Sequence, residues 1–253
     1  MLLRKLKLDW RYGVGEFVIV VMGVLVALGV DSWNDVRRDD DLEREYLSAL
    51  KADLERDTAA LSDAIMNAED RSRSGGVVLA SLGGSPIDVD PHDFIRWVHA
   101  TYALSYPGYS RSTIKDLLST GNLRLLRDRE LRSRLDEYYS LIDYYEQFRE
   151  VWRDLQVAME HVIPELIDWD HRQAILAELG RQRQWVGGKF VATAADAERV
   201  VERIEAHPNA RHRIQNMTRV QGTHHGHLVE IKALAIEVLD LISFGVDGAR
   251  VAT

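Results

Sequence analysis

GVGEFVIVVMGVLVALGVDSWN, residues 13–34, is the stretch that decides the fold of this 253-residue chain. Its segment 17–30 carries no charged side chain. Residues 13–30 make about 18 positions, near the lower limit for a helix that crosses a bilayer at roughly 1.5 Å per residue. We therefore predict a transmembrane helix at 13–30, a basic cytoplasmic N-terminus at 1–12, and one extracytoplasmic helical domain at 31–253.

Amphipathic aromatic residues flank the apolar run on both sides. Trp10 and Tyr12 precede it, and Trp33 follows it. In a helix the two tryptophans would be roughly 34 Å apart, close to the separation of the two membrane interfaces where such rings settle. Glu16 would lie just inside the span, where a carboxylate costs less than at the midplane. We predict Trp10, Tyr12 and Trp33 as interface anchors.

A cleaved signal peptide and a buried core helix are alternative interpretations of this segment. A basic start, an apolar centre and a small-residue site at 27–29 are typical of a signal peptide. A retained anchor is favoured because the part before the apolar run is long and carries Trp10, Tyr12 and Glu16. A core helix is disfavoured because basic residues crowd one flank only.

The distribution of Lys and Arg predicts the orientation of the anchor. Four basic residues precede the apolar run, whereas the residues just after it are rich in aspartate diluted by arginine. Lys and Arg favour the cytoplasmic side of a membrane, and they count more than net charge. We expect the N-terminus in the cytoplasm and the bulk of the chain outside it. The basic residues are Arg4, Lys5, Lys7 and Arg11.

Composition narrows the classes of function. The chain has no cysteine, which excludes disulfides, thiolate metal sites and cysteine nucleophiles. Its net charge is −8, and the part beyond the basic N-terminus is more acidic still. Because that field repels polyanions, we expect no nucleic acid partner. Phosphate-binding Gly-rich loops and the Gly-x-Ser-x-Gly elbow do not occur, so we predict no cofactor and no enzymatic activity.

Helical periodicity dominates the remainder of the chain. An apolar stripe runs from Leu42 to Ile65, and nothing between Val30 and Leu42 breaks a helix. Asp90 followed by Pro91 predicts a helix start. We predict an all-α fold in which one N-terminal transmembrane helix is followed by an extracytoplasmic bundle of roughly seven helices. The later helices are expected near 91–104, 110–118, 128–159, 165–179, 194–206 and 209–242.

Small residues mark one face of the predicted span. Gly23 and Ala27 form a small-xxx-small pair, with Gly15 nearby and Glu16 at the cytoplasmic edge. Such a face lets another membrane helix approach closely, although small residues are common in spans in general. We predict that Gly15, Glu16, Gly23 and Ala27 dock the span against other membrane helices.

His224, His225 and His227 form the strongest chemical cluster in the sequence. On a helix His224 and His227 share a face, with Glu230 one turn further along. Imidazoles and a carboxylate suit zinc or copper. However, glycines flank the cluster, and a short polar patch of this kind is more typical of an exposed kink. We predict no metal site, and the three histidines stay weak candidates for one.

Aromatic residues recur along the predicted helix 128–159. They could line a cofactor or pigment pocket. Amphipathic aromatics on a bundle helix are more often core residues whose hydroxyls reach the surface, and we expect that arrangement here. The residues are Tyr138, Tyr139, Tyr144, Tyr145, Phe148 and Trp152.

The anchor as a whole follows a recognisable order: Tyr-x-x-Gly-Glu at 12–16, an aliphatic run with Gly-Val-Leu-Val-Ala-Leu at 23–28, and Trp-Asn at 33–34. In this it resembles a family of uncharacterised bacterial single-pass membrane proteins. Asp31 stands where that family has Asn. Segments 114–126 and 131–139 resemble the family more weakly. The resemblance implies a membrane-tethered helical domain in a bacterial inner membrane, and it transfers no site residues.

These features favour a non-enzymatic accessory or scaffolding subunit that stabilises a larger membrane protein complex, for example a respiratory or photosynthetic one. The expected partners are other membrane protein subunits and the lipid bilayer, and a homo-oligomer stays open. One alternative is a membrane-anchored sensor that binds a ligand. Another is a metal-binding protein centred on the histidine cluster.

Overall fold

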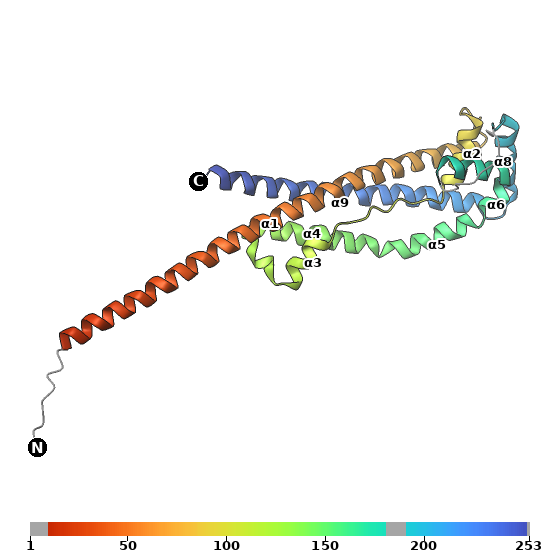
Figure 1. The fold of residues 1–253 in the computed structure, drawn as a ribbon. Helices are drawn as coiled ribbons and strands as arrows, with labels where there is room; N and C mark the ends of the chain where they lie inside the picture. Colours follow the sequence, from red (N-terminus) through yellow and green to blue (C-terminus); the bar gives the residue numbers. More distant parts are fainter. Residues whose placement is uncertain (1–9, 181–190, 252–253) are drawn as a thin grey trace, which may run out of the picture. The chain divides into compact units, whose positions relative to one another are not determined.

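The computed structural model describes residues 10–180 and 191–251, and the side chains within 17–180 and 191–244. In these ranges the chain is helical and has no strand (Figure 1). Beyond the long N-terminal helix, the described part of the chain has seven α-helices of eight residues or more. The predicted all-α fold, with one long apolar N-terminal helix followed by a helical domain, is confirmed.

Helix α1 (Trp10–Ser81) is a single element of 72 residues. It begins before the apolar run and continues through the stripe 42–65, so the predicted continuity of these two segments is confirmed. The absence of proline from these residues permits this length, because each backbone N–H can donate to a carbonyl one turn earlier. The helix ends shortly before Gly84, whose φ of +91° lies in the left-handed region that glycine tolerates.

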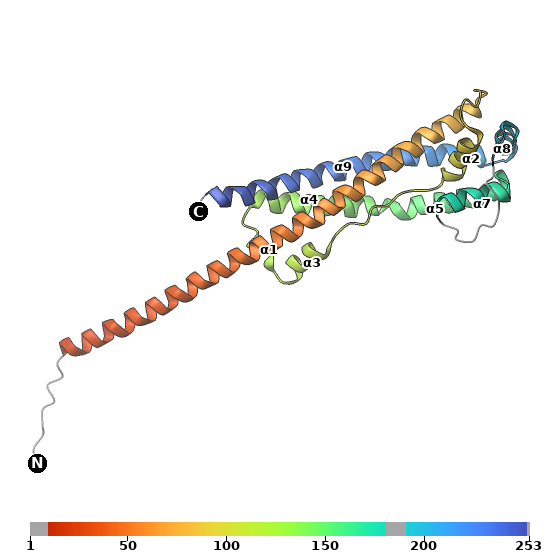
Figure 2. The ribbon, with the colours of Figure 1, turned by 45° about the horizontal axis from the view of Figure 1, so that its top comes forward.

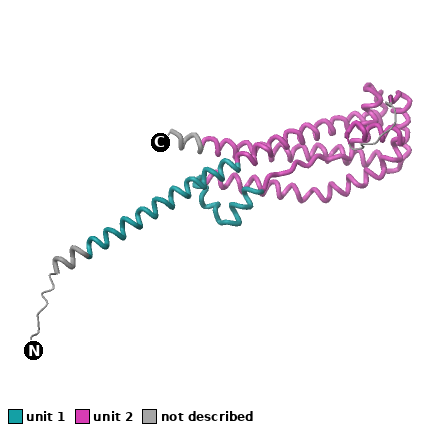
Figure 3. Tube along the Cα trace, viewed as in Figure 1, with its two compact units in different colours: residues 1–50, 112–128 teal, residues 51–111, 129–253 magenta. Residues whose placement is uncertain are grey.

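The chain divides into two compact units (Figure 3). Unit 1 comprises residues 1–50 and 112–128, and unit 2 comprises residues 51–111 and 129–253. Helix α1 contributes residues to both. The predicted boundaries after residues 12 and 30 concern the two sides of a membrane rather than packing, so they stay predictions.

In unit 1, polar contacts hold a short helical segment against α1. This segment contains α3 (Ser112–Ser119) and the 3₁₀ helix η1 (Asn122–Leu125). Tyr46 of α1 donates a hydrogen bond to Asp116 (2.7 Å) and accepts one from Asn122 (2.9 Å). Gly121, with φ +73°, turns the chain between the two helices.

Ion pairs extend this attachment within unit 1. Arg127 pairs with Asp40 and with Glu43, and its backbone N–H donates to the Glu43 carboxylate at 2.8 Å. Arg124 lies 3.9 Å from Asp39. The acidic residues that follow the apolar run are therefore paired with arginines in part, and exposed pairs of this kind each contribute little stability.

Unit 2 is built around α9 (Ala210–Val251), which α4 (Arg129–Glu146) and α5 (Phe148–Glu160) accompany side by side (Figures 1 and 2). The prediction of one helix over 128–159 is wrong in detail, because the chain leaves regular helix at Gln147. Gln147 keeps helical backbone angles (φ −63°, ψ −29°), and the segments on both sides of it contact α9.

Four shorter helices pack together at one end of unit 2: α2 (Pro91–Ala100), α6 (Ile163–Leu166), α7 (Trp169–Glu178) and α8 (Ala194–Ala206). The predicted helix 165–179 is divided into the end of α6 and α7, because the backbone leaves the helical region at Ile167 (φ −120°, ψ 127°) and Asp168 (φ −58°, ψ 151°). The helix predicted at 209–242 is instead α9, which continues to Val251.

Side-chain caps fix two of these helix starts. Asp90 caps α2 as predicted, since its carboxylate accepts from the backbone N–H groups of His92 (2.9 Å) and Asp93 (3.3 Å). Thr193 and Asp196 form a reciprocal capping box on α8, which the sequence interpretation passed over. Each cap satisfies N–H groups that have no partner inside the helix.

An apolar core fills this end of unit 2. It joins the last turns of α1 to the short helices and to the start of α9. Its most buried side chains come from these elements and from the end of α5, and they include Val78, Leu82, Phe94, Ile95, Val98, Met159, Ile163, Leu166, Ile175, Val200, Ile204 and Ile214.

Helices α1 and α9 approach closely at Gly75. A Cβ at this position would lie 3.1 Å from Thr218 Cγ2 and closer still to its hydroxyl, whereas a Cβ at Gly76 would meet nothing within 4 Å. The two neighbouring glycines share one helix and differ in what surrounds them. They therefore separate the cost of crowding from the intrinsic preference of a helix for alanine.

We predict that Gly75→Ala destabilises unit 2 relative to Gly76→Ala. Replacing glycine inside a helix gains about 1 kcal/mol at either position. Crowding Thr218 costs roughly 1–3 kcal/mol at position 75 only. Chemical denaturation of the purified full-length variants should therefore place Gly76→Ala above the parent protein and Gly75→Ala below Gly76→Ala by about that crowding cost. Equal stabilities for the two variants would contradict the close contact.

Candidate functional site: an exposed apolar helix and a histidine–aromatic cavity

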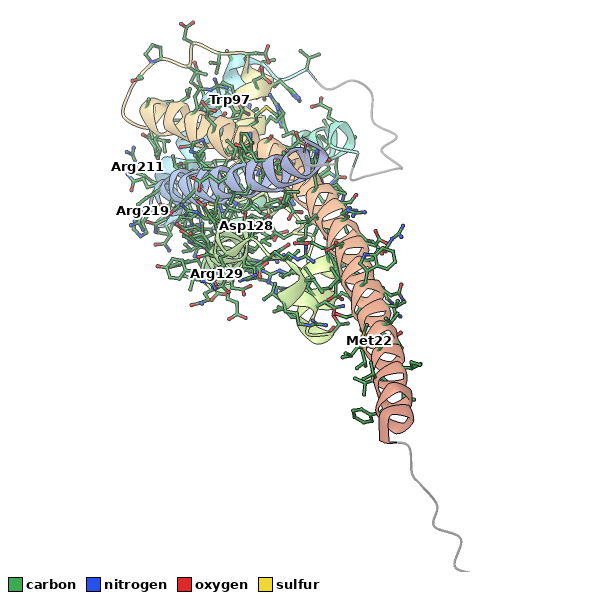
Figure 4. The ribbon with its side chains drawn as sticks, turned by 90° about the vertical axis from the view of Figure 1, so that its left-hand side faces the viewer. Met22, Trp97, Asp128, Arg129, Arg211 and Arg219 are labelled. Atoms are coloured by element: carbon green, nitrogen blue, oxygen red, sulfur yellow. The ribbon has the colours of Figure 1, made fainter. Side chains whose placement is uncertain are left out.

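The apolar run of α1 has no cover from the described part of the chain. The residues from Phe17 to Val30 are exposed, among them Ile19 at 74%. Met22, 58% exposed, projects outward from the helix (Figure 4). Among the described residues α1 is the one helix long and apolar enough to cross a membrane. A surface of this kind marks a contact with lipid or with another apolar helix.

The predicted docking and anchor residues fall in two groups. Gly23 and Ala27 are exposed on α1, and a Cβ built on Gly23 would meet nothing within 4 Å. Trp33 is 64% exposed, and the Arg37 guanidinium lies 5.8 Å from its ring centroid. The side chains of the remaining docking and anchor residues lie outside the part that the structure describes. These are Trp10, Tyr12, Gly15 and Glu16.

In unit 2 the histidine cluster is divided. His224 is buried, and its Nε2 lies 2.8 Å from the backbone carbonyl oxygen of Ser105, to which it donates. His227 is half-buried among aromatic rings, and His225, also half-buried, makes none of those ring contacts. No group of three or more His, Asp or Glu side chains suited to hold a metal ion occurs among the described residues.

Rings from α4 and α5 enclose the His227 imidazole. The Tyr145 ring stacks on it with centroids 3.7 Å apart and planes 12° from parallel. The Trp152 ring lies 5.5 Å away at 19°, and Phe148 lies 5.8 Å away. Trp152 also meets His224 edge to face at 5.1 Å. Tyr145, Phe148 and Trp152 of the aromatic stripe therefore pack against the histidines of α9.

The expectation that this stripe belongs to the core holds for part of it. Tyr138, Tyr139 and Trp152 are buried, whereas Tyr144 is 53% exposed. Hydroxyls of the buried tyrosines do not all reach solvent, because Tyr138 donates to the buried carboxylate of Asp57 at 2.8 Å. Burial and this carboxylate raise the pKa of Tyr138, so its hydroxyl stays protonated as a donor.

Residues 102–111 form an extended segment between α2 and α3 (Figures 1 and 2). Side chains of the surrounding helices bind its backbone. Asp57 accepts from the Ser110 N–H (2.8 Å), Tyr139 donates to the Ser110 carbonyl (3.2 Å), and Gln221 donates to the Ala103 carbonyl. Together with the hydrogen bond from His224 to the Ser105 carbonyl, these contacts pair backbone groups that would otherwise be paired within a helix or a sheet.

The extended segment is the element that sequence analysis missed. Its composition resembles an ordinary helix connection, and its partners come from positions distant in the sequence. The available signal was the buried pair Asp53 and Asp57, two carboxylates on the otherwise apolar face of α1. Buried carboxylates require hydrogen-bond donors, so they indicated that a polar segment must pack there.

A cavity of about 30 Å³ lies where the extended segment meets α4, α5 and α9. Tyr106 and Tyr109 line it from the segment, and His224 and His227 line it from α9. The α4 and α5 side chains at its wall are Ile142, Tyr145, Glu146, Arg149 and Trp152.

Burial governs the protonation of the groups around this cavity. It lowers the pKa of His224, although the hydrogen bond to Ser105 opposes the shift. It also lowers the pKa of His227 against the opposing effect of Glu230. Burial and a hydrogen bond to Glu230 raise the pKa of Tyr145 to about 12. Both imidazoles are therefore held toward the neutral form.

A Ser-x-x-Lys spacing occurs at the start of α3, in unit 1, but its geometry gives no nucleophile. Ser112 and Lys115 are both exposed, and no hydrogen bond between their side chains is present in the described part of the chain. A serine nucleophile needs a base within hydrogen-bond reach.

Comparisons with protein-family models, with curated proteins and with solved structures each found no match for this chain. Its function is therefore inferred from its own residues and geometry.

We predict that acid weakens unit 2 through the imidazoles of His224 and His227, whose pKa values burial lowers. A histidine with a lowered pKa in the folded state takes up a proton more readily when unfolded. Stability should therefore be independent of these groups above the ordinary value of about 6.5 and should fall as the pH drops below it. Denaturation of the full-length protein at pH 7.5 and at pH 5.5 measures the effect.

Replacement of the imidazole provides the control for this pH dependence. His227→Phe keeps a ring between Tyr145 and Trp152 but cannot take up a proton, so stability should fall less between the two pH values. Val229→Phe adds a ring at an exposed position of the same helix, and its stability should fall between the two pH values as much as that of the parent protein. A His227→Phe protein with the full pH dependence would contradict the assignment.

Proposed function

We propose that this protein is a non-enzymatic single-pass membrane protein that acts as an accessory or scaffolding subunit of a larger membrane complex. Its span docks against other membrane helices, and its helical domain packs on the exposed part of the complex. The observation that carries the proposal is the uncovered apolar surface of α1 over residues 17–30.

Two features favour docking over a purely passive anchor. Gly23 and Ala27 lie one turn apart and leave a gap between the bulkier side chains on one side of α1, where another helix backbone could approach. In addition, α1 continues as one helix from the span into the domain, so a partner that binds the span also holds the start of the domain. The resemblance of the anchor to bacterial single-pass proteins accords with this role.

The proposed location is the inner membrane of a bacterium, with residues 1–12 in the cytoplasm and residues 31–253 outside it. The Lys and Arg residues before the span support this orientation.

The absence of cysteine makes the orientation directly measurable. Single variants Ser85→Cys, in the exposed loop after α1, and Lys7→Cys, before the span, can each be treated with a membrane-impermeant maleimide. We expect labelling of Ser85→Cys in intact cells and of Lys7→Cys only after lysis. The opposite pattern would reverse the proposed orientation, and labelling of both in intact cells would contradict a membrane span.

Docking through the small-residue face predicts a specific loss of partners. The full-length tagged protein, extracted in a mild detergent, should co-purify with a fixed set of membrane subunits that mass spectrometry identifies. Gly23→Leu with Ala27→Leu should reduce their recovery by roughly tenfold or more, because the two leucines remove the close helix packing and add a steric clash.

A matched variant on the other side of the span separates docking from insertion. Leu25→Phe adds side-chain volume opposite Gly23 and Ala27 and should leave both membrane insertion and partner recovery unchanged. Recovery of the parent protein as a lone homo-oligomer would count against the accessory role. Equal loss of partners in the Leu25→Phe protein would count against the small-residue face.

A further inference from the structure

The cavity between the extended segment, α4, α5 and α9 is lined by two buried polar atoms that lack hydrogen-bond partners in the described part of the chain. They are the hydroxyl oxygen of Tyr106, on the extended segment, and Nδ1 of His227, on α9. Both residues line the cavity. A buried polar atom without a partner typically costs about 1–3 kcal/mol, so native proteins supply a partner from the chain or from a bound molecule.

The size of the cavity limits what could supply the missing bonds. A cavity needs roughly 10–15 Å³ to hold one water molecule. At about 30 Å³ this cavity has room for one or two non-hydrogen atoms. Its walls are mostly aromatic and aliphatic, and its polar atoms are few, so a bound molecule would be oriented by those two atoms.

The charges at the wall favour a neutral molecule. Glu146 and Arg149 both line the cavity and carry opposite charges. The Arg149 guanidinium already lies 4.8 Å from the Tyr106 ring centroid, where it occupies the position that a small cation would take over that ring. Glu146 and the nearby Glu230, which accepts from Tyr145, disfavour an anion.

The hydrogen-bonding character of the two atoms selects the chemistry further. The Tyr106 hydroxyl can donate or accept. The His227 Nδ1 accepts in one neutral tautomer and donates in the other. A molecule that both donates and accepts satisfies the pair in either tautomer. Water and the smallest alcohols have this property.

We propose that the cavity is a binding site for a small neutral hydrogen-bonding molecule, of one or two non-hydrogen atoms, that bridges the Tyr106 hydroxyl and His227 Nδ1. The bridge ties the extended segment 102–111 to α9 beside the His224 contact with Ser105. The site would exist whichever partners the span has, so its test is independent of the accessory role.

The test uses the full-length protein in detergent micelles with isotope-labelled histidine and tryptophan. Cross-relaxation between a bound water and the ring protons of His227 and Trp152 should be observed by nuclear magnetic resonance. Tyr106→Phe should abolish this water signal and shift the His227 Nδ1 resonance, although the cavity wall keeps its ring. Tyr144→Phe, which removes an exposed hydroxyl beside Tyr145, should change neither.

Two added probes identify the occupant. Saturable transfer from methanol to the Trp152 ring, with loss of the water signal, would show a two-atom occupant of the same chemistry and would support the site. Xenon uptake without a water signal would show a dry apolar cavity and would overturn it. Absence of water, methanol and xenon signals would mean a closed cavity, and it too would overturn the proposal.

Discussion

Helix α1 carries an apolar surface from Phe17 to Val30 that the described part of the chain leaves exposed, and this surface must be removed from water by something else. The same helix runs on to Ser81 without a break, so the requirement applies to an element that contributes residues to both units. A bilayer provides an apolar environment of about the right thickness, and a partner helix could replace lipid along Gly23 and Ala27.

Beyond the apolar run, one face of α1 is buried against other segments of the protein. Its inner face combines apolar side chains such as Leu54 and Leu61 with the buried carboxylates Asp53 and Asp57. Asp57 receives two donors, the Tyr138 hydroxyl and the Ser110 backbone N–H, so its burial is compensated by hydrogen bonds. A buried carboxylate specifies which segment packs against the helix, because it requires hydrogen-bond donors at fixed positions, whereas an apolar side chain would pack equally well against many segments.

The same logic applies on α9. His224 satisfies a backbone carbonyl of the extended segment, and His227 fills a space between aromatic rings. Neutral imidazoles suit both tasks, since one nitrogen donates while the ring packs as an aromatic group. Their burial leaves unit 2 sensitive to acid, and it places the unpaired Nδ1 of His227 at the wall of a small cavity.

The sequence by itself determined the helical class, the continuity of the anchor with the first helix of the domain, and the cap at Asp90, because these depend on residues close together in the chain. It also identified His224 and His227 as chemically distinctive. Only the tertiary structure decided what they do, since their partners Ser105, Tyr145 and Trp152 are remote in sequence. The interruption at Gln147 and the contacts of the extended segment 102–111 with α9 and α1 were likewise visible only in the tertiary structure. Local periodicity does not predict such contacts, because it indicates which face of a helix is apolar but not which segment covers that face.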